Sequence, residues 1–265
     1  MGPIVSLLSD FGLKDSYVAE MKAVILSICG NAQIVDISHL VTKFDVRMGA
    51  FVLASAASRF PKGAVHVAVV DPGVGTWRRS IVVETRHGLF VGPDNGLLML
   101  AARREGIRRV YAISNAEFML RRVSKTFHGR DVFAPVAAHL AGGHAPAEAG
   151  PEIDDYVIPE FVEPVIGARE IMGEVLHIDD FGNAITNISA RHLGEIRVKE
   201  GNYLYIKIDK TNARLKYCSA YGKVEINELL TLVGGHGFLE VAINQGSAAK
   251  KLNARRGMTI QLRSV

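Results

Sequence analysis

The feature that most constrains the fold is an alternation of strand-like and helix-like patterns over the first 150 or so residues. Apolar runs bounded by turn residues predict strands at 3–12, 33–38, 64–71, 80–85, 88–92 and 108–114. Segments with helical spacing of apolar residues predict helices at 15–30, 46–60, 96–106 and 131–143. The run AVHVAVVD (64–71) is continuously apolar, which is typical of a strand covered on both faces. The pattern predicts an α/β layered sheet with mostly parallel strands.

The ends of these helices carry their own signals. Asp15 is a candidate N-cap for the first helix and Gly30 its stop, while Asn95 is a candidate cap for the helix over 96–106. The helix over 46–60 is expected to end before Pro61.

The regular pattern of apolar residues stops after Gly143, where a stretch rich in proline and acidic residues shows little periodicity. Beyond it, short strand-like segments at 170–179, 184–189, 202–209, 213–219, 238–244 and 258–264 are separated by Gly, Asn and Asp turns. They predict a small β-barrel or sandwich. We therefore expect an α/β domain over 1–150, a linker over 151–167 and a β domain over 168–265.

Composition excludes several classes of protein. A chain of 265 residues that is 48% hydrophobic can bury a sizeable core. Its net charge of +4 is mild, and its basic residues form only short pairs, so we expect no nucleic-acid partner. No apolar run approaches the roughly 18 residues of a membrane span and no signal peptide is evident, so we expect no membrane partner and a cytoplasmic location. The two distant cysteines, Cys29 and Cys218, suggest no disulfide framework.

Three stretches are candidates for chemistry, because ligands of open α/β sheets bind beyond the carboxyl ends of the strands. They are SDFG (9–12), DPGVG (71–75) and TFHGRD (126–131), and each sets an ionisable residue beside glycine. A phosphate loop is poorly supported, since Arg78 stands where a G-x-G-x-x-G fingerprint needs its third glycine. No paired metal-ligand motif and no G-x-S-x-G elbow occur, so we expect no metal and see no clear covalent nucleophile.

An acid, a cation and an imidazole remain: Asp71, Arg78 and His128. Each also has an ordinary interpretation, as a turn residue, as part of a solvated Arg78–Arg79 pair, or as a structural histidine. Asp10 could likewise serve only to cap its turn. From spacing alone, the sequence predicts an α/β enzyme-like protein with a small-molecule substrate.

At these loops the sequence resembles a known family. The motifs LLSDFG, HLVTKFDV, VVDPGVGTWRR, GPDNGLL, TFHGRDVFAP, HIDDFGNAITNI and LEVAINQGSAA, in this order, resemble those of the S-adenosyl-L-methionine (SAM) hydroxide adenosyltransferases, relatives of the fluorinase and chlorinase enzymes. The likeness extends from Ile4 to the C-terminus. It implies a Rossmann-like N-terminal domain, a C-terminal β-barrel, and a homotrimer with active sites between subunits. The implied reaction is hydrolysis of SAM to adenosine and L-methionine, with no cofactor.

The resemblance also implies roles for individual residues. Asp71, Arg78 and His128 match the family's catalytic triad, and Asp10 matches the carboxylate that binds the ribose hydroxyls. Phe44 matches an aromatic position beside the substrate. The C-terminal residues that match contacts to methionine and adenine are Asp179, Phe181 and Asn183, with Asp180 an alternative to Asp179.

Two departures from related enzymes bear on the reaction. A halogenase would carry Tyr at the position of Asp71 and Ser at the position of Gly129, so the sequence favours water over halide as the nucleophile. Relatives commonly carry Asn-Ser at Gly234-Gly235, with the Ser near the methionine carboxylate; here backbone N–H groups or His236 are the candidates instead. A SAM-dependent halogenase and a non-catalytic adenosine or SAM binder remain the alternatives.

The chemistry implied by the resemblance explains the residue types. Methionine leaves a sulfonium as a neutral thioether and needs no acid, whereas the attacking water must be held in line and must lose a proton. Asp71 and His128 are the candidate proton acceptors, and Arg78 is expected to orient the water and pair with Asp71. Phe44 and Phe181 suit an adenosine sandwich.

Overall fold

The structure is a computed structural model that describes residues 2–264, and it divides into two compact units, Met1–Pro159 and Glu160–Val265. The division falls inside the segment expected as a linker. Residues up to Pro159 pack with the first unit, where the N–H of Ala112 donates to the Pro151 carbonyl and that of Ile153 to the Val110 carbonyl.

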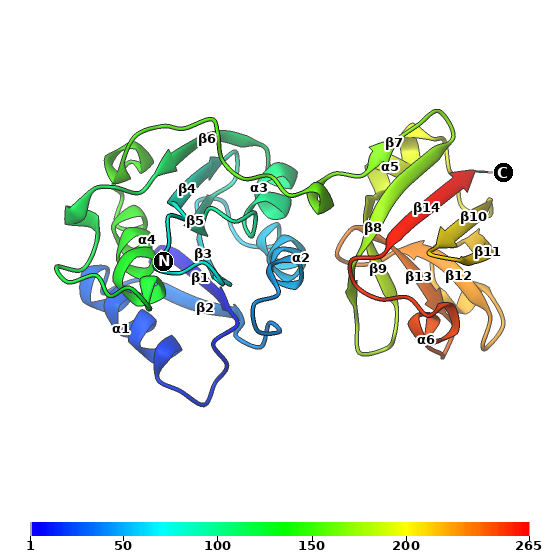
Figure 1. Ribbon diagram of the computed structural model, residues 1–265, viewed down its shortest axis with the longest axis horizontal. Coiled ribbons are helices and arrows are strands. Elements are labelled where there is room, and N and C mark those ends of the chain that lie inside the picture. Colours follow the sequence, from blue (N-terminus) through cyan, green and yellow to red (C-terminus); the bar gives the residue numbers. More distant parts are fainter. Residues whose placement is uncertain (1, 265) are drawn as a thin grey trace. The chain divides into compact units, whose positions relative to one another are not determined.

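The first unit contains a six-stranded sheet in the order β2-β1-β3-β5-β4-β6 (Figure 1). Its strands are β1 (Ile4–Ser9), β2 (Gln33–Ser38), β3 (Val65–Val69), β4 (Ser80–Thr85), β5 (Leu89–Pro93) and β6 (Ile107–Ala112). The pairs β1–β2, β1–β3 and β3–β5 are parallel, while β4 runs antiparallel to both of its neighbours. The expected α/β layered fold with mostly parallel strands is confirmed.

Helices cover both faces of this sheet, and their bounds are α1 (Tyr17–Ile28), α2 (Val46–Ala57), α3 (Met99–Glu105) and α4 (Ala134–Ala141). Helix α1 packs beside α4 and α2 beside α3 (Figure 1). The core between the sheet and the α1–α4 layer contains alternate residues of β1, Val5 and Leu7, with Met21 and Ile25 of α1. Burial on both faces accounts for the continuously apolar β3, all of whose residues are buried.

Helix ends differ from expectation in two places. Ser16, not Asp15, precedes α1, and it makes no capping hydrogen bond there; its hydroxyl instead donates to Glu20 Oε1 at 2.6 Å. Asn95 accepts a hydrogen bond from the N–H of Leu97, but this caps the turn before α3, which begins at Met99. Helix α1 ends at Ile28, close to the expected stop at Gly30.

The second unit is a closed seven-stranded barrel, in the order β14-β10-β11-β12-β13-β9-β8, which the β14–β8 pairing closes (Figure 1). Its strands are β8 (Glu170–Ile178), β9 (Ala184–Ser189), β10 (Tyr203–Ile208), β11 (Thr211–Tyr217), β12 (Leu229–Val233), β13 (Phe238–Ile243) and β14 (Thr259–Ser264). A two-residue strand β7 (Val165–Ile166) adds to β8, and short helices α5 (Ala190–Glu195) and α6 (Ala248–Leu252) lie between strands. The expected barrel is confirmed, although β12 was not expected from the sequence.

Candidate active site

The strand order places two of the candidate loops next to each other. From β1 the chain passes to β2 on one side, and β3 then pairs on the other side, so the strand order reverses between β1 and β3. Ser9 lies opposite Val69 in this parallel pair, so Asp10 and Asp71 follow adjacent strands at the same edge of the sheet. This crevice is where open α/β sheets bind ligands.

Asp71 begins a compact loop that returns to β4. The Val74 N–H donates to the Asp71 carbonyl at 3.3 Å, and the Thr76 hydroxyl donates to the Gly73 carbonyl at 2.6 Å. Gly75 has φ of 74°, and a Cβ there would collide with the Lys125 carbonyl oxygen. Only glycine suits both the conformation and this close approach, which brings the 71–78 loop against the segment before His128.

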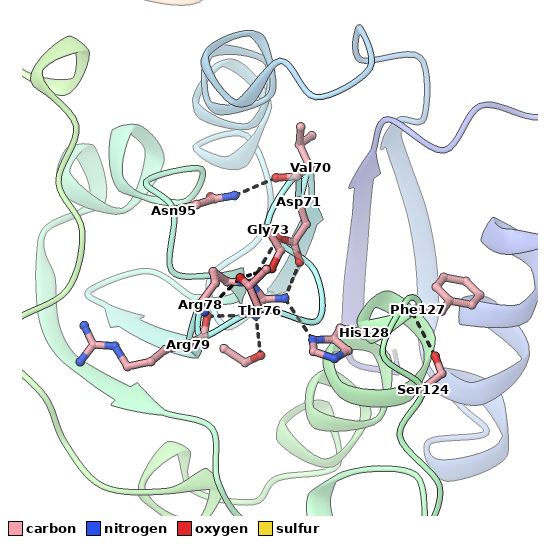
Figure 2. Close-up of polar contacts among 11 residues, drawn as sticks. Val70, Asp71, Gly73, Thr76, Arg78, Arg79, Asn95, Ser124, Phe127 and His128 are labelled. Carbon is pink, nitrogen blue, oxygen red and sulfur yellow. Dashed lines mark hydrogen bonds and ion pairs between the residues drawn. The ribbon is translucent and has the colours of Figure 1, made fainter.

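Arg78 joins the two other members of the expected triad (Figure 2). Its Nε donates to Asp71 Oδ1 at 3.2 Å and its Nη2 to Asp71 Oδ2, forming a bidentate ion pair. The same Nη2 lies 3.1 Å from His128 Nδ1. Nη1 donates to the Ser80 hydroxyl at 2.8 Å, and the guanidinium lies over the Phe133 ring. Both side chains of the ion pair are at least 93% shielded from solvent, so the attraction is only weakly screened.

His128 stands at the start of a π-helical turn, Gly129–Phe133, that leads into α4. Single π turns inside helices are frequent at functional sites. Burial, and next the positive charge of Arg78, lower the pKa of His128 below its usual 6.5. Because a guanidinium can only donate, His128 Nδ1 is the acceptor of their hydrogen bond, and the proton of the neutral ring resides on Nε2.

Aromatic rings connect the third candidate loop to this group. The Phe11 ring contacts the rings of Tyr17 and Phe127, with centroids 5.7 and 5.6 Å away. A Cβ on Gly129 would lie 3.2 Å from both the Phe11 and Phe127 rings. The loops carrying Asp10, Asp71 and His128 therefore meet in one region of the first unit.

Asp10 is buried and holds the neighbouring 39–45 loop. Its Oδ2 accepts a hydrogen bond from the Phe44 N–H at 2.8 Å, and its carbonyl accepts one from Lys43 Nζ. Phe44 itself has a left-handed φ of 65°, unusual for a bulky residue, and its side chain is 68% exposed. The Asp10 carboxylate thus fixes a strained backbone that presents an aromatic ring to solvent.

The expected C-terminal residues share the turn between β8 and β9. Asp179 accepts hydrogen bonds from the N–H of Asn183 at 2.8 Å and from its Nδ2 at 2.9 Å. Phe181, at the tip, is 81% exposed, and Asp180 beside it is exposed as well. The turn therefore presents Phe181 outward from a hydrogen-bonded base. The roles of these residues, like those of the residues in the first unit, stay predictions.

The Gly234–Gly237 segment lies over a buried carboxylate that sequence reasoning did not single out. Glu240 accepts a hydrogen bond from Tyr221 at 2.6 Å and lies 2.9 Å from His236 Nε2. A Cβ on Gly234 would collide with the Glu240 carboxylate, which explains the glycine there. His236 Nδ1 accepts from the Phe238 N–H, so both ring nitrogens already have neighbours within the unit.

The ordinary interpretation of Arg79 as a solvated residue holds only in part. Its side chain is 34% exposed, but its Nε donates to Asp94 at 3.0 Å and its Nη1 pairs with Asp155 at 2.6 Å. Sequence reasoning missed Asp94 and Asp155 as partners because they are 15 and 76 residues away along the chain. The only available signal was the GPDNGLL motif, which places an acid and an amide after β5.

Within residues 2–264, no group of three or more His, Cys, Asp or Glu side chains is arranged to hold a metal ion. No helix in the same residues has the length and apolar character needed to cross a membrane.

Comparison with known proteins gives matches over almost the whole chain. Family models described as the SAM hydroxide adenosyltransferase N-terminal and C-terminal domains match residues 5–150 and 173–261. An (R)-S-adenosyl-L-methionine hydrolase from Salinispora tropica is 39% identical, covering 96% of this chain and 95% of that protein. A fluorinase from Nocardia brasiliensis is 28% identical, covering 98% of this chain and 97% of that protein.

A solved structure shows the same fold. The crystal structure of an uncharacterized conserved protein from Thermotoga maritima matches with a TM-score of 0.88 and 38% identity, covering 98% of this chain and 99% of that one. With both domain models matched in order and full-length relatives above 30% identity, the chain belongs to the SAM hydroxide adenosyltransferase family.

Proposed function

We propose that this enzyme hydrolyses SAM to adenosine and L-methionine by in-line attack of a water molecule on the ribose C5′. The observation that carries the proposal is the hydrogen-bonded series Asp71–Arg78–His128 at the reversal of strand order, in which the Asp71 and Arg78 side chains are largely shielded from solvent. Relatives of matching length that are named (R)-S-adenosyl-L-methionine hydrolases support the same reaction. We propose that it needs no metal or cofactor.

In this reaction the water oxygen forms a bond to C5′ while the C5′–S bond breaks, and its electron pair returns to sulfur. The sulfonium becomes the neutral thioether of methionine, so the leaving group needs no proton. The water loses one proton to the enzyme and one remains on the new 5′-hydroxyl. The enzyme must therefore hold the water in line and accept a single proton.

The hydrogen-bond pattern favours Asp71 as the proton acceptor. His128 Nδ1 is occupied by Arg78, and its Nε2 carries the ring proton, so the neutral ring can donate to the water but cannot accept from it. Each Asp71 oxygen accepts one hydrogen bond from Arg78 and retains a further lone pair. We assign Asp71 as general base, His128 as the donor that orients the water, and Arg78 as the group that holds both.

The remaining predicted residues would bind the substrate. Asp10 would accept hydrogen bonds from the ribose hydroxyls, and Phe44 and Phe181 would stack against the adenosine. Asp179 and Asn183 would contact the methionine and adenine ends. At Gly234–Gly237 we favour backbone N–H groups over the His236 ring, because both nitrogens of that ring already have neighbours.

We propose that the chain works as a homotrimer in the cytoplasm, with each site shared between the first unit of one subunit and the second unit of another. The exposure of Phe44, at 68%, and of Phe181, at 81%, supports this arrangement, since aromatic rings so exposed gain most from a partner surface. Trp77, fully exposed on the 71–78 loop, adds to the apolar surface beside the triad.

A halogenase is the second candidate, since fluorinases are among the relatives. Two observations disfavour it. The Asp71 carboxylate repels a halide, and its bidentate pair with Arg78 takes up the nearest cation. At Gly129, where halogenases carry Ser, a Cβ would lie 3.2 Å from two aromatic rings.

The decisive experiment incubates the purified protein with SAM, with and without chloride or fluoride, and separates the products by chromatography. We expect adenosine and methionine in equal amounts under all conditions. Asp71→Asn keeps the shape but removes the base, and should lower kcat at least about 100-fold, the lower range for a general base.

Asp209→Asn is the matched control, because Asp209 lies in the β10–β11 turn with φ of 51°, a conformation that Asn also adopts. A 5′-halogenated adenosine would establish the halogenase instead. SAM binding without turnover would leave only a non-catalytic binder, and unchanged activity in Asp71→Asn would refute the assigned base.

A further inference from the structure

The turn after β5 contacts both ends of the catalytic 71–78 loop. Asn95 Nδ2 donates to the carbonyl of Val70, the residue directly before Asp71, at 2.9 Å (Figure 2). The Asp94 N–H donates to the carbonyl of Arg79, the residue directly after Arg78, also at 2.9 Å. Two adjacent residues of one turn thus fix the points where the catalytic loop begins and ends.

The Arg79 carbonyl has a second hydrogen bond that reaches the triad itself. Arg78 Nη1 donates to it at 3.0 Å, so the oxygen that Asp94 holds is also a support for the Arg78 guanidinium. The Arg79 side chain points the opposite way, and its Nε donates to Asp94 Oδ2 at 3.0 Å. Asp94 therefore holds Arg79 through both backbone and side chain.

A distant segment completes this arrangement. Asp155 pairs with Arg79 Nη1 at 2.6 Å, and its carbonyl accepts from Nη2 at 2.7 Å. The Val157 N–H donates to Asp94 Oδ1 at 2.8 Å, and Pro159 packs directly on Gly96. The Asp94 side chain is only 2% exposed, and both of its oxygens accept hydrogen bonds.

We propose that Asp94, Asn95 and Arg79 are positioning residues for the Asp71–Arg78 pair, and that Asp155 holds Arg79 in place from the segment that ends the first unit. The proposal concerns the triad of the proposed hydrolase. The physical basis of this role is that the Arg78 guanidinium must stay aligned with the Asp71 carboxylate while its Nη2 donates to His128. A displacement of about 1 Å at such a site can cost about 100-fold in rate.

The test needs variants that disturb the turn without changing charge near the triad. Asn95→Ala removes the donor to Val70. Arg79→Lys keeps the charge but loses the guanidinium that bonds Asp94 and Asp155 at the same time. If Arg78 moves away from His128, the pKa of His128 should rise toward 6.5. Two-dimensional NMR of the histidine ring protons across pH 4–8 would measure this, with about 6.5 as the upper reference.

The kinetic readout is the separation of kcat from KM. We expect both variants to lower kcat about tenfold or more, with KM for SAM within about twofold of the wild type. A purely structural role would lower the fraction of folded protein and leave the His128 titration of the folded molecules unchanged.

The chain provides a close control for each variant. Asn115 plays the same two roles in a different turn, accepting from the Glu117 N–H at 3.0 Å and donating to the Glu148 carbonyl at 2.9 Å. Arg109, which lies 4.0 Å from Glu152 of the same connecting segment, matches Arg79. Asn115→Ala and Arg109→Lys should leave the His128 titration and kcat unchanged.

The outcomes separate this proposal from the proposed function. A raised His128 pKa in the variants of a protein that does not hydrolyse SAM would uphold the positioning role and refute the hydrolase. Unshifted His128 titration in Arg79→Lys and in folded Asn95→Ala would overturn the positioning role. If Asn95→Ala does not fold, Arg79→Lys alone decides.

Discussion

Arg78 and Arg79 show how two adjacent identical side chains acquire different tasks. In the segment just before β4 they turn to different partners, Arg78 to Asp71 and His128 and Arg79 to Asp94 and Asp155. Both form charge-assisted hydrogen bonds, which are about twice as strong as neutral ones. What distinguishes them is burial: the Arg78 side chain is 7% exposed and that of Arg79 is 34% exposed.

The lowered pKa of His128 predicts the pH dependence of the reaction. Burial and Arg78 disfavour the imidazolium, so the ring is neutral at pH 7 and becomes protonated only below its usual 6.5. Protonation of Nδ1 would break the contact with Arg78. We therefore expect kcat/KM to be level as pH falls from 8 to about 6.5 and to decline only at lower pH.

The lowered pKa of His128 also makes the folding stability depend on pH. The unfolded chain binds the proton more readily than the folded one, so the contribution of His128 is fully present above pH 6.5 and is lost as pH falls below it. An acid limb of kcat/KM centred above pH 6.5, or one that does not follow the NMR titration of His128, would contradict this assignment.

Gly129 gives a second prediction at the level of one residue. In Gly129→Ser, the new Cβ would lie 3.2 Å from the rings of Phe11 and Phe127, so both must move by a few tenths of an ångström. We expect a loss of about 1–2 kcal/mol in unfolding free energy, typical of overpacking. SAM hydrolysis should fall several-fold, and no halogenated product should form, because Asp71 is still present. Denaturant unfolding and product chromatography measure the two effects, and a halogenated product would show that Gly129 alone excludes halide.

At the level of elements, the loop between β2 and α2 holds strain that binding would explain. Phe44 adopts φ of 65°, a conformation that costs an L-residue roughly 1–2 kcal/mol, while its ring is largely exposed. The Asp10 carboxylate compensates by accepting the Phe44 N–H. Strain of this kind, held by a buried acid, is common at ligand sites.

Phe44→Gly separates the strain from the binding role. Glycine adopts this conformation freely, so we expect the unfolding free energy to stay the same or rise by up to about 1 kcal/mol. KM for SAM should rise about 5-fold or more through loss of stacking on the adenosine. Phe60→Leu is the control. The Phe60 ring contacts the ring of His66 and none of the triad residues, so this variant should leave KM unchanged. An unchanged KM in Phe44→Gly would remove Phe44 from the substrate site.

The elements themselves were largely predictable, because strand and helix periodicity is local. The β3 run and the apolar spacing of α1 carry their structure in a few neighbouring residues. Strand β12 escaped prediction because LLTLV is a short apolar run without clear alternation. The contacts of Arg79 escaped because they depend on strand pairing and on a segment 76 residues away. That the loops of Asp71, Arg78 and His128 converge was expected from their places beyond strand ends, and the family resemblance named them as a triad, whereas their hydrogen-bond directions required the structure.

At the scale of the whole molecule, the proposed function draws on residues of both compact units. The proposed triad, Asp10 and Phe44 belong to the first unit, and the exposed Phe181 lies on the β8–β9 turn of the second. A head-to-tail ring, in which each subunit offers one surface to the next, would form one shared site for each subunit. Light scattering should then give a mass about three times the 28.8 kDa of the chain.

Complementation between two impaired variants tests the shared site directly. Asp71→Asn impairs only the first unit's part of the site, and Phe181→Ala only the second unit's part. Phe181 is exposed enough that its loss should not affect folding. Co-expressed as mixed trimers, an intact first unit meets an intact second unit with a chance of one half times one half. The randomly assembled population, homotrimers included, should therefore show about a quarter of wild-type activity at SAM concentrations below KM, above the mean of the two variants measured separately. Activity equal to the mean of the two variants would instead mean that each site lies within one chain, and a stable, active monomer would exclude the trimer altogether.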